Sequence, residues 1–202
     1  MSICAILIPS RARPERLWKT IRSVRETSAP GAAEILVRFD DDDHASLAIV
    51  DDLAAADVRV LVGPRRQGYP SLSDFYTELA DSATSPWMWI MNDDACIGGT
   101  AHLEHQGWDG QLAAVPQDRF IVQPEIYQWN QSSYPFCEGG AFPAVPNLVW
   151  RRFGFPTIGT PIDTWLDQLL RGRHGWKTHF LRGVSVIHMR DRDDELAEHR
   201  KL

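Results

Sequence analysis

Short apolar runs alternate with amphipathic segments along the first half of the chain. The apolar runs predict buried strands at residues 2–9, 33–40, 58–63 and 86–92. Between them, apolar residues at helical spacing predict helices over residues 13–27, 45–56 and 71–83. Strands that alternate with helices in this way are typical of βαβ units, and these build a mostly parallel sheet with helices on its faces. We therefore predict an α/β fold.

The second half of the chain is less regular. Its patterns predict two strands and two helices, at residues 119–124, 178–188, 146–154 and 160–176. Residues 98–118 are typical of loop and short helix, and residues 125–146 are rich in aromatic residues, glycine and proline, which favours a further loop. Because no repeat or low-complexity linker divides the chain, we expect one domain over residues 1–190, followed by a charged tail over 191–202.

Composition narrows the class of protein. Of the 202 residues 44% are apolar, which is enough for one sizeable core, and the net charge of −6 argues against a surface that coats nucleic acid along its whole extent. The three cysteines are far apart, which excludes a disulfide framework and favours a reducing compartment. No apolar run approaches the length of a membrane span. We therefore expect a soluble, cytoplasmic protein.

The residues that follow the predicted strands are mostly polar. They are Pro9, Ser10, Arg11, Asp40, Arg65, Asp93 and Asp94. In open parallel sheets, ligands bind outside the carboxyl ends of the strands. The convergence of these residues on one edge of the sheet therefore predicts a binding site there.

Each acidic candidate has two interpretations. Asp93 and Asp94 follow a nearly continuous apolar run. Their carboxylates are either solvated in a β-turn or neutralised by a hard divalent ion that is shared with a diphosphate. Asp40 begins an acidic run that is either a polar loop or a source of hydrogen-bond acceptors for a nucleobase or ribose. His188 is either a satisfied interior residue or a metal ligand. Asp163 either caps a helix or takes part in chemistry.

In their order along the chain, these segments resemble the GT-A glycosyltransferases, and most closely glycosyltransferase family 2. The resemblance rests on six motifs: "IPSRARPERL", "LVRFDDDD", "MNDDA", "VWRRFGFP", "IDTWLDQLLRGRHGWK" and "SVIHM". They extend over roughly residues 3 to 190, which is nearly the whole chain. The resemblance implies a single domain of GT-A type with a Rossmann-like sheet, and it identifies "MNDDA" with the family's DxD-like acidic motif.

The resemblance also implies a role for each candidate residue. The nucleotide-sugar would be held by Pro9, Ser10, Arg11, Asp40, Arg65 and Asp93. Asp94 and His188 would ligate Mn²⁺ or Mg²⁺, and Asp163 would be the catalytic base. The implied reaction is an inverting displacement, in which the base takes the proton of the acceptor hydroxyl and the metal offsets charge on the departing nucleoside diphosphate.

The acceptor side would be lined by residues 125–146. There Trp129, Tyr134 and Phe136 either stack on a sugar or base or pack within the loop, and Glu138 is a further candidate acid. Because the Q-x-x-R-W motif of processive synthases is missing, we expect transfer of a single sugar. The expected donor is a UDP-sugar. The acceptor would be a glycan or, in a bacteriophage, a hydroxymethylated DNA base.

Three other classes of protein compete with this interpretation. A sugar nucleotidyltransferase needs a glycine-rich turn after the first strand, and "IPSRARPE" contains no glycine. A non-catalytic nucleotide-sugar or glycan-binding module that has kept the fold is the main alternative, but the presence of Asp40, Asp94, Asp163 and His188 together argues against a site that has lost its chemistry. A Mg²⁺-dependent nuclease or phosphatase would need several acids clustered around one scissile phosphate.

Overall fold

The computed structural model describes residues 2–66, 71–99, 107–128, 133–134, 141–154 and 162–189. The strands in these ranges are β1 (Cys4–Pro9), β2 (Ala33–Asp40), β3 (Val58–Gly63), β4 (Trp87–Ile90), β5 (Ala95–Gly99), β6 (Phe120–Gln128), β7 (Ser133–Tyr134), β8 (Ala144–Pro146) and β9 (Lys177–His188). The α-helices are α1 (Pro14–Glu26), α2 (His44–Leu47), α3 (Val50–Ala55), α4 (Ser71–Ser82), α5 (Trp108–Ala113), α6 (Asn147–Phe153) and α7 (Ile162–Leu166). A π-helical segment, η1 (Asp167–Arg173), continues α7.

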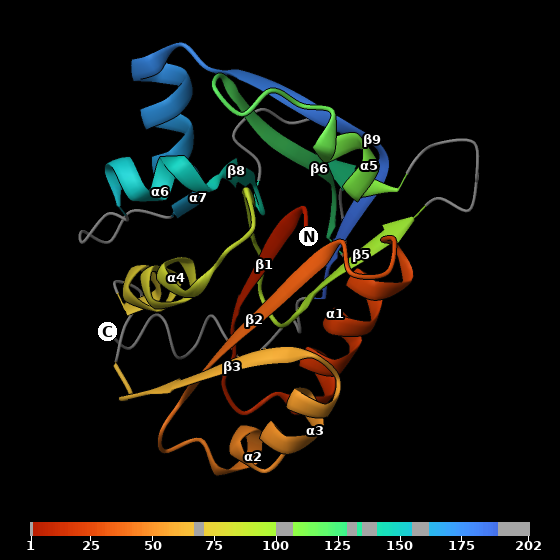
Figure 1. Cartoon of the computed structure of the whole chain (residues 1–202), viewed down its shortest axis with the longest axis vertical. Helices are drawn as coiled ribbons and strands as arrows, with labels where there is room; N and C mark the ends of the chain where they lie inside the picture. Colours follow the sequence, from red (N-terminus) through yellow and green to blue (C-terminus); the bar gives the residue numbers. More distant parts are fainter. Residues whose placement is uncertain are drawn as a thin grey trace.

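Within the described ranges, nine strands form one sheet (Figure 1) in the order β3-β2-β1-β4-β8-β6-β9-β5, and β7 pairs with β6. The neighbours among β1, β2, β3 and β4 are parallel. The carboxyl ends of these strands therefore lie on one edge, and the predicted α/β class is confirmed. The other half of the sheet mixes directions, because β8 is antiparallel to β4 and β5 is antiparallel to β9.

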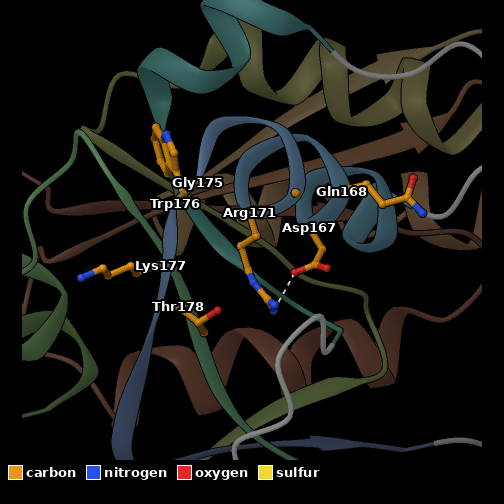
Figure 2. Close-up of a pocket in the computed structure, with 8 residues that line it drawn as sticks. Asp167, Gln168, Arg171, Gly175, Trp176, Lys177 and Thr178 are labelled. Carbon is orange, nitrogen blue, oxygen red and sulfur yellow. Dashed lines mark ion pairs between the residues drawn. The ribbon is translucent and has the colours of Figure 1, made fainter.

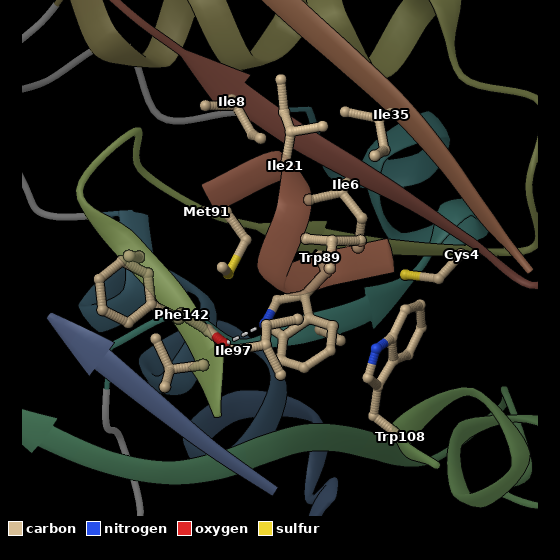
Figure 3. Close-up of a cluster of buried hydrophobic side chains, with 14 of the residues drawn as sticks. Cys4, Ile6, Ile8, Ile21, Ile35, Trp89, Met91, Ile97, Trp108 and Phe142 are labelled. Atoms are coloured by element: carbon tan, nitrogen blue, oxygen red, sulfur yellow. Dashed lines mark hydrogen bonds between the residues drawn. The ribbon is translucent and has the colours of Figure 1, made fainter. Parts of the chain in front are cut away.

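Both faces of the central strands are buried. Ile6 and Ile8 belong to the hydrophobic cluster that contains α1, whereas Leu7 belongs to the cluster that contains α4. Figure 3 shows the first cluster, in which Trp89 Nε1 donates a hydrogen bond to the carbonyl oxygen of Phe142 at 2.8 Å. This bond satisfies the polar atom of a fully buried indole. A core that is packed on both faces fixes the strand ends, and so it fixes the residues that follow them.

The helix predicted over residues 45–56 is wrong, because the structure has two short helices there. The backbone N–H of Ile49 bonds to the carbonyl of Ser46 at 3.2 Å, which tightens the chain at the end of α2. Asp51 and Asp52 then lie in the first turn of α3, where carboxylates interact favourably with a helix N-terminus. The acidic pair therefore suits a new helix start better than the middle of a longer helix.

Two predicted loops also contain strands. β5 was not predicted because it contains two glycines, which disfavour strands. Packing explains one of them, since a Cβ at Gly98 would lie 2.9 Å from Ser185 Oγ on the paired strand. β6 was predicted to end at Pro124, yet it continues to Gln128. The register shift between Gln123 and Glu125 accommodates the proline, which cannot donate a backbone hydrogen bond.

No helix in the described ranges is long and apolar enough to cross a membrane. The predicted tail over 191–202 lies outside the described residues. The domain boundary at residue 190 therefore stays a prediction.

Glu34, at the start of β2, provides a test of the sheet's stability. Its Oε2 accepts hydrogen bonds from Ser85 Oγ at 2.7 Å and from the backbone N–H of Thr84 at 3.0 Å. Burial raises the pKa of this carboxyl, but the hydrogen bonds from Ser85 and Thr84 outweigh burial and lower it overall. We expect Glu34→Gln to lower the free energy of unfolding by about 1 kcal/mol at pH 7.

The pH dependence of this effect has a definite sign. A lowered pKa in the folded state means that the carboxylate stabilises the protein above its unfolded pKa, and that this contribution disappears as the pH falls through the folded pKa. Urea denaturation at neutral pH and at a pH below both values should therefore separate Glu34 from Glu34→Gln only at neutral pH. An equal difference at both pH values would contradict the assignment to the ionised group, and Asp118→Asn, at an exposed position, is the control.

Candidate active site

The register of β5 and β9 brings Asp94 beside His188. Ala95 pairs with His188, and the backbone N–H of Met189 bonds to the carbonyl of Asp94 at 2.7 Å. The Oδ1 atom of Asp94, which is buried and has no hydrogen-bond donor of good geometry in the described residues, lies 3.3 Å from His188 Nε2. Two residues that are 94 positions apart therefore place a carboxylate oxygen against an imidazole nitrogen.

Asp93 is fully buried, so the interpretation of this motif as a solvated turn is wrong. Its Oδ2 accepts a hydrogen bond from Ser10 Oγ at 2.7 Å, and its Oδ1 lies 2.8 Å from Arg13 Nη2. Thr20 Oγ1 donates to the backbone carbonyl of Asp93 at 3.0 Å. The carboxylate is thus held from two sides by residues of the β1–α1 segment.

One arginine contacts both carboxylates of the acidic pair. Arg13 also reaches Asp94, with its Nη1 atom 3.4 Å from Oδ2. Burial alone raises the pKa of Asp94, but its interaction with His188, together with the charge of Arg13, lowers it overall. Asp94 is therefore ionised at neutral pH, as a metal ligand or an ion-pair partner must be.

Asp40 lies at the same edge, at the end of β2. Its Oδ2 accepts a hydrogen bond from Arg11 Nη1 at 2.7 Å, and its Oδ1 accepts one from Arg38 Nη1. The rest of the acidic run differs in role, because Asp43 caps α2 and also accepts a hydrogen bond from the backbone N–H of Ala12 at 2.7 Å. The acidic run that begins at Asp40 therefore lies in a loop held by hydrogen bonds, and Asp40 and Asp43 are not simply solvated.

Pro9 and Arg65 flank this arrangement. Pro9 is the last residue of β1, and the backbone N–H of the next residue, Ser10, bonds to the carbonyl of Arg38 at 3.0 Å. Arg65 is half exposed, and its Nη1 lies 3.3 Å from Asp42 Oδ2. The structure thus gathers eight of the predicted site residues at one edge of the sheet: Pro9, Ser10, Arg11, Asp40, Arg65, Asp93, Asp94 and His188.

Asp163 belongs to a different part of the fold. It lies in the first turn of α7, where its Oδ1 accepts a hydrogen bond from the backbone N–H of Thr164 at 2.8 Å. Burial raises the pKa of this carboxyl. In the described ranges, the structure has no hydrogen bond or ion pair between Asp163 and the acidic pair. A raised pKa is typical of a general base, but the structure does not bring Asp163 into contact with the other candidates.

The acceptor-side candidates are described only in part. Trp129 and Glu138 lie outside the described residues, and Phe136 does too. Tyr134 belongs to β7, which pairs with β6 through Ile126. Their predicted roles therefore stay predictions.

A polar cavity of about 670 Å³ lies elsewhere, between η1 and the start of β9 (Figure 2). It is lined by Asp167, Gln168, Arg171, Gly172, Gly175, Trp176, Lys177 and Thr178. An ion pair of 3.0 Å joins Arg171 to Asp167. Lys177 and His188 stand at opposite ends of β9, which is roughly 35 Å long if fully extended. The cavity is therefore distinct from the acidic edge and contains none of the predicted site residues.

Sequence reasoning missed three residues of the site. Arg13 contacts both carboxylates of the acidic pair, Thr20 contacts the backbone of Asp93, and Arg38 contacts Asp40. Arg13 stands two positions after Arg11 in the same turn, which was an available signal. Thr20 and Arg38 lie inside a predicted helix and a predicted strand, where a polar residue gives no sign of its direction.

The residues at this edge fit a divalent cation. Neighbouring ligands of an octahedral Mg²⁺ or Mn²⁺ are about 3 Å apart, given metal–ligand distances near 2.1 Å. The 3.3 Å between Asp94 Oδ1 and His188 Nε2 is close to that separation, and the buried Oδ1 is available as a ligand. In the described ranges no group of three or more histidine, cysteine or acidic side chains forms a metal site. A cation here would therefore need further ligands from a bound molecule or from water.

A sheet with helices on both faces and charged residues beyond its carboxyl edge is the arrangement of nucleotide-binding α/β proteins. The model of one protein family, glycosyl transferase family 2, matches residues 5–134. This match covers more than half of the chain, and the chain belongs to that family. No curated protein sequence matches it significantly.

Solved structures show the same fold at low sequence identity. TarS of S. aureus, residues 1–349 in complex with UDP-GlcNAc, is 10% identical with a TM-score of 0.71, over 98% of this chain and 61% of that one. GalNAc-T7 with UDP, GalNAc and Mn²⁺ is 14% identical with a TM-score of 0.71, over 96% of this chain and 45% of that one. The chain thus spans about 60% of the length of the TarS structure. The GT-A fold predicted from the sequence is confirmed.

Proposed function

We propose that the protein is an inverting glycosyltransferase that moves one sugar from a nucleoside-diphosphate sugar, with UDP as the expected nucleotide, to an acceptor hydroxyl. The observation that carries the proposal is the buried acidic pair at the end of β4, in contact with Arg13 and His188 and on the same edge as Asp40. Similar structures support it, because they are of complexes with UDP, UDP-GlcNAc or UDP with Mn²⁺.

The residues divide into two groups by their chemistry. Asp40 and Arg11, which are paired with each other, would offer an acceptor and a donor to a nucleoside. Ser10 and Arg13 hold the buried carboxylate of Asp93, whose proposed partner is a ribose or sugar. Asp94 and His188 would hold Mn²⁺ or Mg²⁺. When bound, the cation would offset the negative charge that develops on the leaving diphosphate.

The acceptor side needs a base. In the proposed reaction the acceptor oxygen attacks the anomeric carbon, the bond to the diphosphate breaks, and a carboxylate takes the hydroxyl proton. Asp163 is our candidate, because burial raises the pKa of its carboxyl and so makes it a stronger base. The described contacts do not link Asp163 to the donor edge, so an acceptor that approaches from α7 is part of this proposal.

The acceptor molecule and the cellular location of the protein belong to the same proposal. A glycan is the first acceptor to test, and a hydroxymethylated DNA base in a bacteriophage is the second. The net charge of −6 disfavours a broad DNA contact, although paired arginines such as Arg151 and Arg152 provide local positive charge. A cytoplasmic location fits the supply of nucleotide-sugars in either case.

Calorimetric titration of UDP, GDP and dTDP, each with and without Mn²⁺, tests the part of the proposal that concerns the sugar donor. We expect UDP to bind, and to bind more tightly with the metal. Absence of binding by all three nucleotides would reject the proposal. UDP binding without sugar transfer to any acceptor in a glycan and DNA panel would favour a non-catalytic binding module of the same fold.

A further inference from the structure

The two carboxylates of the acidic pair are adjacent in the chain and almost completely buried. Asp93 has 0% and Asp94 has 3% of its surface exposed. Two like charges in this position repel each other and have lost most of their hydration, so the pair is costly unless positive charge lies beside it. A metal ion is one source of that charge, and a side chain of the protein is another.

Arg13 supplies positive charge to both carboxylates. Its Nη2 lies 2.8 Å from Asp93 Oδ1, and its Nη1 donates to Asp94 Oδ2 at 3.4 Å. The first distance is that of a strong charged pair, whereas the second is longer than an ordinary hydrogen bond. The contact of Arg13 with Asp93 is therefore firm, and its contact with Asp94 is the one that is more easily released.

The backbone on both sides of Arg13 is held in place. Ala12 has a left-handed φ of 55°, which is strained for a residue with a Cβ, and its N–H donates to Asp43 Oδ2 at 2.7 Å. After Arg13, helix α1 begins at Pro14, and the carbonyl of Arg13 accepts a hydrogen bond from the N–H of Leu17 at 3.0 Å. The backbone of Arg13 is thus fixed beside the acidic pair, while its side chain is 32% exposed and has room to move.

The two oxygens of Asp94 face different partners. Oδ1 lies 3.3 Å from His188 Nε2, and these two atoms are the ones that fit Mn²⁺ or Mg²⁺, whereas Oδ2 faces Arg13. A divalent cation on this carboxylate would share it with a guanidinium group. Positive charges that are so close repel each other, and the repulsion is strong where water is partly excluded. Arg13 and a metal ion therefore compete for the charge of one aspartate.

We propose that Arg13 is an internal counter-cation of the acidic pair, which stabilises the two carboxylates in the metal-free protein and opposes the binding of a divalent cation to Asp94. The diphosphate of a nucleotide brings negative charge, and this charge offsets the repulsion between Arg13 and the metal ion. The metal ion therefore binds weakly to the protein alone and more tightly to its complex with the nucleotide. Arg13 sets the size of that difference.

This inference rests on the proposed function, and Mn²⁺ itself is the probe. The EPR signal of free Mn²⁺ is followed in titrations of the wild type, Arg13→Gln, Arg13→Lys and Arg22→Gln, with and without UDP. Without UDP, we expect Arg13→Gln to bind Mn²⁺ about tenfold more tightly than the wild type or better, because one nearby positive charge is removed. Arg13→Lys keeps the charge and should stay near the wild type. Arg22→Gln removes an exposed charge from the same helix and is the matched control.

Thermal unfolding provides a second measurement. Without metal, the acidic pair of Arg13→Gln lacks its counter-charge, so the Tm of this variant should be lower than that of the wild type. Mn²⁺ should then raise the Tm of Arg13→Gln more than it raises the Tm of the wild type, because the variant binds the ion more tightly. An arginine with a structural role alone would give the same loss of Tm with and without Mn²⁺.

The possible outcomes are distinct. A wild type that binds no Mn²⁺ in the presence of UDP rejects the metal site of the proposed function. If the wild type does bind Mn²⁺ with UDP, a folded Arg13→Gln that binds Mn²⁺ alone no more tightly than the wild type rejects this inference and leaves the proposed function intact. So does a wild type that binds Mn²⁺ equally well with and without UDP. If Arg13→Gln does not fold without metal, its thermal transition is measured with Mn²⁺ present. Recovery of the transition supports the inference, and its absence overturns it.

Discussion

An Asp94→Ala variant is expected to lose metal-dependent binding of UDP by about 100-fold or more while it keeps its fold. The carboxylate oxygen that faces His188 at 3.3 Å is the oxygen that would ligate the cation, and alanine removes it. The measurement is calorimetric titration of UDP with and without Mn²⁺. The metal-dependent part of the affinity should disappear, and metal-free binding should change little.

Asp109→Ala is the matched control for this variant. Asp109 lies on α5 and is also a buried carboxylate, and it accepts a hydrogen bond from the backbone N–H of Ala29 at 3.1 Å. Its replacement should lower stability without changing the effect of Mn²⁺ on UDP binding. Retention of full metal dependence in Asp94→Ala would mean that other residues hold the cation.

Asp163→Asn is expected to lower the rate of sugar transfer by about 10²–10⁴-fold while UDP affinity stays at the wild-type value. Asparagine has the size of aspartate but cannot take a proton from the acceptor hydroxyl. The measurement is the rate of transfer at saturating donor, together with UDP titration. Asp167→Asn, one turn further along and paired with Arg171, is the control and should keep the wild-type rate.

The pH dependence of transfer adds a second criterion for Asp163. Because burial raises the pKa of its carboxyl, the rate should fall as the pH falls through that raised value, and this limb should lie above the pKa of an ordinary aspartate. The limb should be missing from the residual activity of Asp163→Asn. Full activity in that variant would place the base elsewhere, and Glu138, which lies outside the described residues, is the next candidate.

The parallel half of the sheet could be predicted because its central strands β1, β2 and β4 are buried on both faces. Such strands are continuous apolar runs, and each ends where polar residues begin, as at Asp40 and Asp93. The rule that ligands bind at carboxyl ends then placed Ser10, Asp40 and Asp93 on one edge, and the structure has them there. Local pattern and three-dimensional position agreed because the connections are short and regular.

The remainder depended on contacts that no local pattern contains. β5 is a strand only because β9 is beside it, and its glycines disfavoured that prediction. Arg38 is a polar residue within an apolar strand, and the sequence does not predict its contacts. In the structure its acceptors come from α4 and from the segment after β3. Long-range pairing decides both features, whereas the sequence periodicities describe single elements.

The pairing of β5 with β9 also determines when the site is complete during folding. The carboxylate and the imidazole that face each other are separated by 94 positions along the chain, and the parallel strands β1 to β4 do not include the second of them. Contacts between residues so distant in sequence form slowly, because a long loop must close before they are made. The residues of the nucleotide edge that follow β1, β2 and β4 do not depend on β9, whereas a cation held between Asp94 and His188 would stabilise the pairing of β9 with β5.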